Sequence, residues 1–165
     1  MAVRPIRFFG DPILRSKCDP IPLGTPAART LAEDLVDTVR EPGRAGVAAN
    51  QIGVGLRAFS YNVDGDVGYI LNPTLAEVRG DPEPVDEGCL SVPGFSFPRI
   101  RYPYARVTGT DVDGNPVELQ GEGLMAQALQ HELDHLDGKL YIEGLEPEIK
   151  RDALRAIRQA DWFRA

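Results

Sequence analysis

Histidine and cysteine are scarce in this chain of 165 residues, which contains only two of each. Two cysteines are too few for a disulfide framework, so the sequence is not that of a small secreted domain held together by disulfides. No apolar run is long enough to cross a membrane, and the first residues lack the apolar stretch of a secretory signal. We therefore expect a cytoplasmic protein that has no membrane partner.

Positive charge is also in short supply, with 18 lysines and arginines against 25 aspartates and glutamates. A formal net charge of −7 favours repulsion of nucleic acid, so we expect no direct nucleic-acid site. Neither internal repeats nor a long linker divides the chain. Its length and its 42% hydrophobic content suit one compact domain, residues 1–165, with its own core.

Both histidines stand in one short segment, residues 130–135, which reads QHELDH. On a helix, His131 and His135 lie on one face, where both imidazoles can bind one metal ion while Glu132 reaches the water on that ion. The alternative is that the two histidines bind no metal and belong to a solvated helix face, or are two hydrogen-bonded core groups. If the site is real, its third ligand is not a histidine, because the chain has no other.

The sequence after this segment separates the chain from the longer zincins, which continue with a glycine and then a third histidine. Here Gly138 occupies the first position, but Tyr141 occupies the second. A cysteine thiolate would complete a tetrahedral site and leave one position open for water. Cys18 lies in a polar segment without other ligand-type residues, whereas Cys89 lies in a short apolar segment, where the alternative is a buried strand cysteine.

Three separated segments resemble the bacterial peptide deformylases: GVAANQ at residues 46–51, EGCLS at residues 87–91 and QHELDH at residues 130–135. They occur in the order and at the spacing typical of that family, so the resemblance spans nearly the whole chain. An aspartate directly before the second histidine, here Asp134, is typical of the same family and not of zincins in general. The three segments together are far more specific than any one of them.

The resemblance implies a metal-dependent hydrolase that removes the N-formyl group from the formyl-methionine of newly synthesised polypeptides and releases formate. It assigns the metal to Cys89, His131 and His135, and the general acid/base role to Glu132. One divalent ion per chain is implied, iron(II) in the cell, although zinc, nickel and cobalt also suit these ligands.

The resemblance also assigns substrate contacts. The side-chain amide of Gln51 and the backbone N–H of Leu90 would stabilise the oxyanion, and the backbone of Gly46 would contact the substrate peptide. One position departs from the family, which usually has a glycine where this chain has Arg44. Arg44 therefore raises a question about the rim of the pocket.

Helical spacing extends the candidate site backwards along the chain. Leu124, Gln127 and Ala128 precede His131 by seven, four and three residues, so they share its face of the helix. Leu124 and Ala128 could line an apolar slot for the methionine side chain, with the more polar Gln127 at its edge. The alternative for Leu124 is an ordinary core position.

Two other functions fit parts of the pattern. A small metallopeptidase could use the same helix, but Tyr141 in place of a third histidine and the thiolate, which softens the Lewis acidity of the metal, both weaken that interpretation. A structural or sensing metal site is the second alternative. Glu132 argues against it, because a purely structural site needs no carboxylate beside the water.

The C-terminal stretch could add a partner. In some members of the family a basic C-terminal helix docks on the ribosome. Here five basic residues face four acidic ones between residues 146 and 164, an excess of only one. We therefore favour a solvated amphipathic helix over a transient ribosome contact.

We expect an α+β fold, with antiparallel β-sheets packed around a central metal-binding helix and with a C-terminal helix. The start signal Thr25-Pro26 and the stop signal Pro42-Gly43 bound the first helix. The other expected elements are strands at 56–62, 68–72 and 74–78, a loop at 81–84, a hairpin of 106–111 and 116–120, the metal helix at 122–136 ending at Gly138, a strand at 139–142 and a helix after Pro147.

Overall fold

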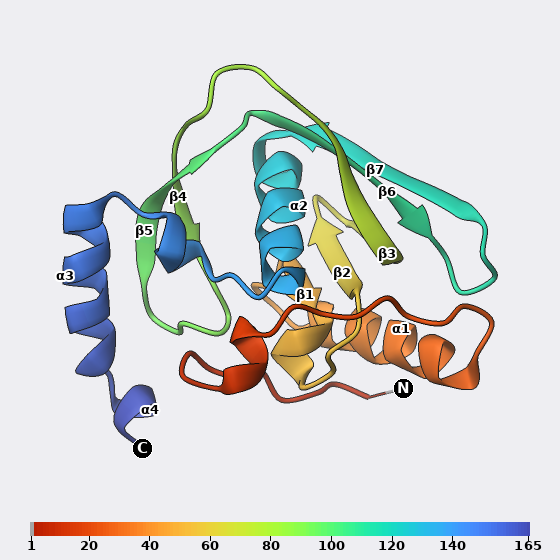
Figure 1. The fold of residues 1–165 in the computed structure, drawn as a ribbon, viewed down its shortest axis with the longest axis horizontal. Helices are drawn as coiled ribbons and strands as arrows, with labels where there is room; N and C mark the ends of the chain where they lie inside the picture. The colour runs from red at the N-terminus through yellow and green to blue at the C-terminus, as the bar shows by residue number, and fades with distance from the viewer. Residues whose placement is uncertain (1) are drawn as a thin grey trace.

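The computed structural model describes residues 2–165 and consists of two antiparallel sheets with helices around them (Figure 1). The larger sheet has five strands in the order β1-β2-β3-β6-β7, and the smaller sheet pairs β4 with β5. This architecture confirms the expected α+β fold. The strands are β1 Gly46–Ala48, β2 Ala58–Val63, β3 Asp66–Arg79, β4 Glu83–Gly88, β5 Ser96–Arg101, β6 Tyr104–Thr110 and β7 Pro116–Glu122.

Four α-helices and three short 3₁₀ segments complete the chain from residue 2 onward. The two longest helices have 14 residues each, and none of the helices described has both the length and the hydropathy to span a bilayer. The α-helices are α1 Pro26–Val39, α2 Gly123–Leu136, α3 Pro147–Arg158 and α4 Asp161–Arg164, and the 3₁₀ segments are η1 Pro12–Arg15, η2 Ala49–Ile52 and η3 Tyr141–Gly144.

Helix α2 lies between the two sheets (Figure 1). Its residues Ala126, Leu129, Leu133 and Leu136 recur at intervals of three and four, which places them on one face, and all four are buried against the five-stranded sheet. The opposite edge of the helix is thereby turned toward β4 and β5. Packing of the apolar face therefore determines where the polar face of α2 points.

Local signals at the helix ends behave as expected. The Thr25 side chain accepts a hydrogen bond from the Ala28 N–H at 3.2 Å, and Pro26 occupies the first turn of α1. Gly138 has a positive φ of 76° after α2, and an added Cβ there would approach the Arg15 carbonyl oxygen to 2.6 Å. The predicted boundaries of α1 and α2 are confirmed, as is the hairpin of β6 and β7.

The separation of residues 68–72 and 74–78 into two strands was wrong. Residues 66–79 form one strand, β3, whose pairing with β6 shifts register between Leu71 and Thr74. Asn72 takes a positive φ of 49° at this point. The Asn-Pro pair thus marks a β-bulge inside a strand, not a strand end.

Two further expectations were wrong. Residues 83 and 84, assigned to a loop, begin β4, where Pro84 is tolerated because β4 is an edge strand. The strand expected at 139–142 does not form: residues 139 and 140 lie outside any helix or strand, and Tyr141 and Ile142 begin the 3₁₀ segment η3 and pack against α3. Strands β1 and β5 were not anticipated.

The helix expected after Pro147 is confirmed as α3, which buries Ala153 and Ile157 and exposes most of its charged residues. Figure 1 shows α3 outside the two-stranded sheet, on the side away from α2. This is the geometry of an amphipathic surface helix.

Replacing Leu129 by alanine should lower the free energy of unfolding by about 2–5 kcal/mol, because the side chain is fully buried between α2 and the sheet. Leu75→Ala is the control, since Leu75 is 47% exposed on β3 and should change stability by less than about 1 kcal/mol. Urea unfolding of both variants checks the difference. Equal losses would contradict the assignment of α2 as the centre of the core.

Candidate metal centre and active site

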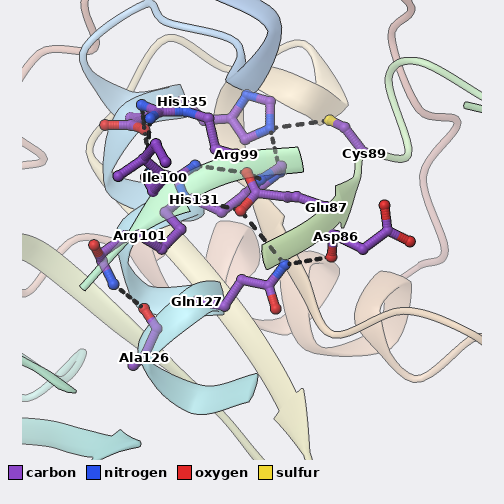
Figure 2. Close-up of polar contacts among 12 residues, drawn as sticks. Asp86, Glu87, Cys89, Arg99, Ile100, Arg101, Ala126, Gln127, His131 and His135 are labelled. Atoms are coloured by element: carbon purple, nitrogen blue, oxygen red, sulfur yellow. Dashed lines mark hydrogen bonds and ion pairs between the residues drawn. The ribbon is translucent and has the colours of Figure 1, made fainter. Parts of the chain in front are cut away.

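The polar face of α2 and the end of β4 bring three metal-ligand side chains together (Figure 2). The Nε2 atoms of His131 and His135 lie 3.1 Å apart, and Cys89 Sγ lies 3.3 Å from His135 Nε2. All three ligand atoms lie within 4.8 Å of one another. Cys18 is not part of this group. It is buried in the core cluster beside α2, and burial raises its thiol pKa to about 11.

This cluster fits a single metal ion. A tetrahedral ion with bonds of about 2.1 Å to nitrogen and 2.3 Å to sulfur holds its ligand atoms roughly 3.5 Å apart, close to the separations observed. Two imidazole nitrogens that face each other at hydrogen-bond distance otherwise need a proton between them. Two imidazoles and one thiolate are also a ligand set that divalent transition metals favour.

A buried carboxylate orients the first histidine. Glu87, the penultimate residue of β4, lies 2.8 Å from His131 Nδ1 through its Oε2. Arg101 on β5 donates to both Glu87 oxygens, at 2.8 Å and 2.6 Å (Figure 2). It also donates at 2.7 Å to Asp134 on α2. With Nδ1–H donated to Glu87, the Nε2 lone pair of His131 faces the metal position.

The charges within the site are strongly coupled. Burial alone would raise the pKa of Glu87, but the hydrogen bonds from Arg101 and His131 outweigh it and lower the pKa to about 2. Burial opposes the charged form of His131, but Cys89 and Glu87 raise its pKa well above the usual value. Burial and the neighbouring His131 lower the pKa of His135 well below it. The two shifts are opposite because a charge on one imidazole disfavours a charge on the other.

Glu132 is positioned to exchange protons. Its side chain is buried, and its Oε2 has no hydrogen-bond partner among residues 2–165. Burial raises the pKa of Glu132 to about 7, which suits a group that must take and return a proton near neutral pH. A Cβ added to Gly46 would approach Glu132 Oε1 to 2.5 Å. Residue 46 therefore has to be glycine if the carboxylate is to stay in place.

Gln51 presents its amide nitrogen to the site. Its Oε1 accepts from the Ala48 N–H at 2.9 Å, while its Nε2 donates to Ser91 Oγ at 3.1 Å and approaches Cys89 Sγ at 3.7 Å. This pattern fixes which end of the amide faces the cavity. Leu90, the residue after Cys89, lines the same cavity.

A cavity of about 480 Å³ lies in front of the ligand cluster and is bordered by every residue that the sequence placed in the substrate site, including Gly46, Leu124 and Ala128. Leu124 is 47% exposed, which excludes the alternative of a core position. Gln127 also lines the cavity and donates at 3.0 Å to the Asp86 carbonyl. A second, larger groove, bordered on α2 by Gln130 and Asp134, contains none of the candidate ligands.

The side chain of Arg44 does not enter the cavity. Its neighbours Gly43 and Ala45 line the cavity, but the Arg44 guanidinium donates at 2.9 Å to the Thr38 carbonyl near the end of α1. The rim is therefore formed by the backbone of this segment and by small side chains. Arg44, the residue that departs from the family pattern, therefore stabilises the C-terminal end of α1.

Sequence reasoning missed the residues that support the ligands. Glu87 and Ser91 were quoted in their motif without a role, and Arg101 carried no local signal. Arg101 is separated from its partners Glu87 and Asp134 by 14 and 33 residues. The position of Glu87, two residues before the candidate ligand Cys89, was the one sequence signal that could have suggested a supporting role for Glu87.

A buried carboxylate without a partner, beside two imidazoles and a thiolate at the base of a cavity, is an arrangement of metal-dependent hydrolases. The model of one family, described as polypeptide deformylase, matches residues 3–151. A peptide deformylase of Acidothermus cellulolyticus is 48% identical over 98% of this chain and 89% of its own length. The chain belongs to the polypeptide deformylase family, whose members are metal-dependent enzymes that remove N-formyl groups from new polypeptides.

Solved structures agree with this membership. A peptide deformylase from Legionella pneumophila superposes with a TM-score of 0.88 at 36% identity, covering 96% of this chain and 95% of that one. A peptide deformylase from Ehrlichia chaffeensis, solved in complex with actinonin, has a TM-score of 0.86 at 28% identity, with coverage of 98% and 99%.

Removing one member of the buried ion pair should be far more harmful than removing a surface arginine. Arg101→Met leaves Glu87 buried without its partner, so we expect a loss of about 3–5 kcal/mol in the free energy of unfolding. Metal affinity should also fall by about tenfold or more, because the orientation of His131 is lost. Urea unfolding and metal analysis measure the two effects.

The matched control is Arg106→Met. Arg106 pairs with Glu118 at 3.4 Å on the surface of the large sheet and should contribute less than about 1 kcal/mol. Similar losses in the two variants would show that the buried pair has no special role.

Arg44→Ala should leave the kcat/KM of formyl-peptide hydrolysis unchanged, because the guanidinium points to α1 and not into the cavity. Stability should fall by about 0.5–1.5 kcal/mol through the lost hydrogen bond to Thr38. A clear change in KM for a formyl peptide would mean that Arg44 reaches the substrate.

Proposed function

We propose that this chain removes the N-formyl group from the N-terminal formyl-methionine of newly synthesised polypeptides by metal-assisted hydrolysis, and that it acts as one catalytic domain in the cytoplasm. The convergence of Cys89, His131 and His135 beside the unpartnered carboxylate of Glu132 carries this proposal. The membership of the family supports the same reaction.

Cys89, His131 and His135 hold the divalent ion in this proposal, and Glu132 acts as the general acid/base. The ion, when bound, supplies a Lewis acid that lowers the pKa of coordinated water toward neutrality. Glu132, with a pKa raised by burial, takes a proton as water attacks the formyl carbonyl and returns it to the leaving amine.

Gln51 and Leu90 stabilise the negative charge that develops on the formyl oxygen. The Nε2 group of Gln51 faces the ligand cluster, and its orientation is fixed before substrate arrives because Ala48 holds the other end of the amide. The backbone N–H of Leu90 is the second donor. Two preorganised donors in an enclosed site can lower the activation free energy by several kcal/mol, which is roughly the cost of losing one oxyanion donor.

Substrate selection rests on the apolar part of the cavity. Leu124 and Ala128 lie one turn apart on α2 and form the slot for the methionine side chain. Gly46 allows the peptide backbone to approach closely, because it has no side chain to separate the peptide from the base.

The ligand set suits iron(II), which we propose as the ion in the cell, and equally accepts zinc, nickel or cobalt. Iron beside a thiolate is vulnerable to oxygen, so low activity in air does not contradict the proposal. Transient ribosome contact through the C-terminal stretch stays a prediction. The near balance of five basic and four acidic residues between residues 146 and 164 favours an independent surface helix.

The reaction is tested with protein purified without oxygen, a formyl-Met-Ala-Ser peptide, and metal analysis of the same sample. Formate release should rise in proportion to bound metal. An acetyl-Met peptide and a peptide cut only at an internal amide serve as controls, and cleavage of the internal amide would favour a metallopeptidase. Full metal occupancy without formate release would favour a structural or sensing site.

Glu132→Ala should keep its metal but lose at least about 10²–10⁴-fold in kcat, because the proton acceptor is removed while the three ligands remain. Metal content and formate release measured on one preparation separate the two effects. Undiminished turnover by a metal-loaded variant would refute the role of Glu132.

A further inference from the structure

The last helix of the chain contacts the rim of the active-site cavity. Trp162, the second residue of α4, donates its indole N–H to the Pro93 carbonyl at 3.0 Å. Pro93 and Gly94 border the cavity and lie in the turn that joins β4 to β5. Helix α4 follows residue 151, where the family match ends, so Trp162 lies outside the matched part of the chain. The C-terminus is thus tied to the wall of the cavity.

The second half of this turn has few other contacts to hold it. In the first half, the Phe9 N–H donates at 2.8 Å to the Ser91 carbonyl. Gly94 has a positive φ of 84°, and an added Cβ there would meet no atom within 4 Å. Among residues 2–165, the bond from Trp162 is the only hydrogen bond that Pro93 and Gly94 make. The conformation of the rim at this point therefore depends on one donor.

This donor restricts more than a single oxygen atom. The peptide group is planar, so the carbonyl that accepts from Trp162 and the N–H of Gly94 can only move together. The indole is itself held in place, because its ring packs edge-on against Phe8 with centroids 5.5 Å apart. Next to it, Phe163 packs on Phe9 at 5.7 Å. The N-terminal segment and α4 therefore present the indole N–H in a fixed position.

We propose that Trp162 is a positioning residue for the substrate cavity, and that its N–H holds Pro93 and Gly94 in the conformation that receives the peptide. This inference rests on the proposed deformylase function and assigns part of its substrate affinity to the C-terminal helix. Among residues 2–165, the hydrogen bond and ring contacts of Trp162 involve neither a metal ligand nor Glu132. The chemical step should therefore not depend on it.

The first test is Trp162→Phe, which removes the donor but keeps an aromatic ring against Phe8. Without the donor, the rim has to be ordered when the substrate binds, so KM for formyl-Met-Ala-Ser should rise by about two- to tenfold, the equilibrium factor of one hydrogen bond. The kcat and the metal content should stay close to those of wild type. A merely structural role would reduce the fraction of active enzyme, and so kcat, without changing KM.

A second variant isolates the hydrogen bond from the packing of the ring. Trp162 is the only tryptophan of the chain, so protein made in a tryptophan auxotroph with benzothienylalanine is changed at this residue alone. Sulfur replaces the indole N–H in this analogue, while the shape of the ring system is kept. The same increase in KM is expected.

Tyr104→Phe is the matched control. It also removes one donor from an aromatic ring, the hydroxyl that donates at 2.8 Å to Gln120 on the large sheet, and Tyr104 does not border the cavity. Its KM should equal that of wild type.

An unchanged KM in the benzothienylalanine protein would overturn the proposal, whatever Trp162→Phe shows. An equal increase in Tyr104→Phe would also overturn it, because any lost ring donor would then have the same effect. Absence of formate release by metal-loaded wild type would refute the deformylase function itself. That failure is distinct from a failure of the role of Trp162, which requires an active wild type.

Discussion

The buried ion pair between Glu87 and Arg101 is the contact on which the geometry of the metal centre depends. The side chains are 2% and 5% exposed, and either charge would be strongly unfavourable in that position without the other. Glu87 also receives the His131 ring, and Arg101 also reaches Asp134 on α2. The two-stranded sheet and the helix are therefore joined through one network of charges, and the imidazole cannot rotate without breaking a buried hydrogen bond.

The same network explains how ligands from distant parts of the chain meet. Cys89 follows Glu87 by two residues, so the anchor that orients His131 also fixes the strand end that carries the thiolate. On the other side of α2, the apolar face is locked against the five-stranded sheet by residues such as Leu129 and Leu133. The histidine face is left with one orientation, toward the end of β4. Core packing and ion pairing thus act on opposite sides of a single helix.

The elements with strong local signals could be predicted from the sequence, and those without them could not. Thr25-Pro26 and Gly138 determine helix ends through their own backbone and side-chain chemistry, so α1 and α2 were correctly bounded. Strands β1 and β5 are short and carry glycine or proline, and their pairing depends on partners far along the chain. The candidate ligands came from motif spacing and family resemblance, whereas Arg101 became visible only when the fold brought it to Glu87.

The chemistry of the site restricts which amino acid can occupy position 46. A general base must be close to the reacting atoms and poorly solvated if its pKa is to lie near the working pH, and both conditions require a tight enclosure. Strand β1 forms one wall of that enclosure, and an added Cβ at residue 46 would approach the carboxylate oxygen of Glu132 to 2.5 Å. Even alanine would thus displace either the strand or the base. The glycine has an ordinary φ, so it is required by the space that Glu132 occupies and not by the backbone conformation.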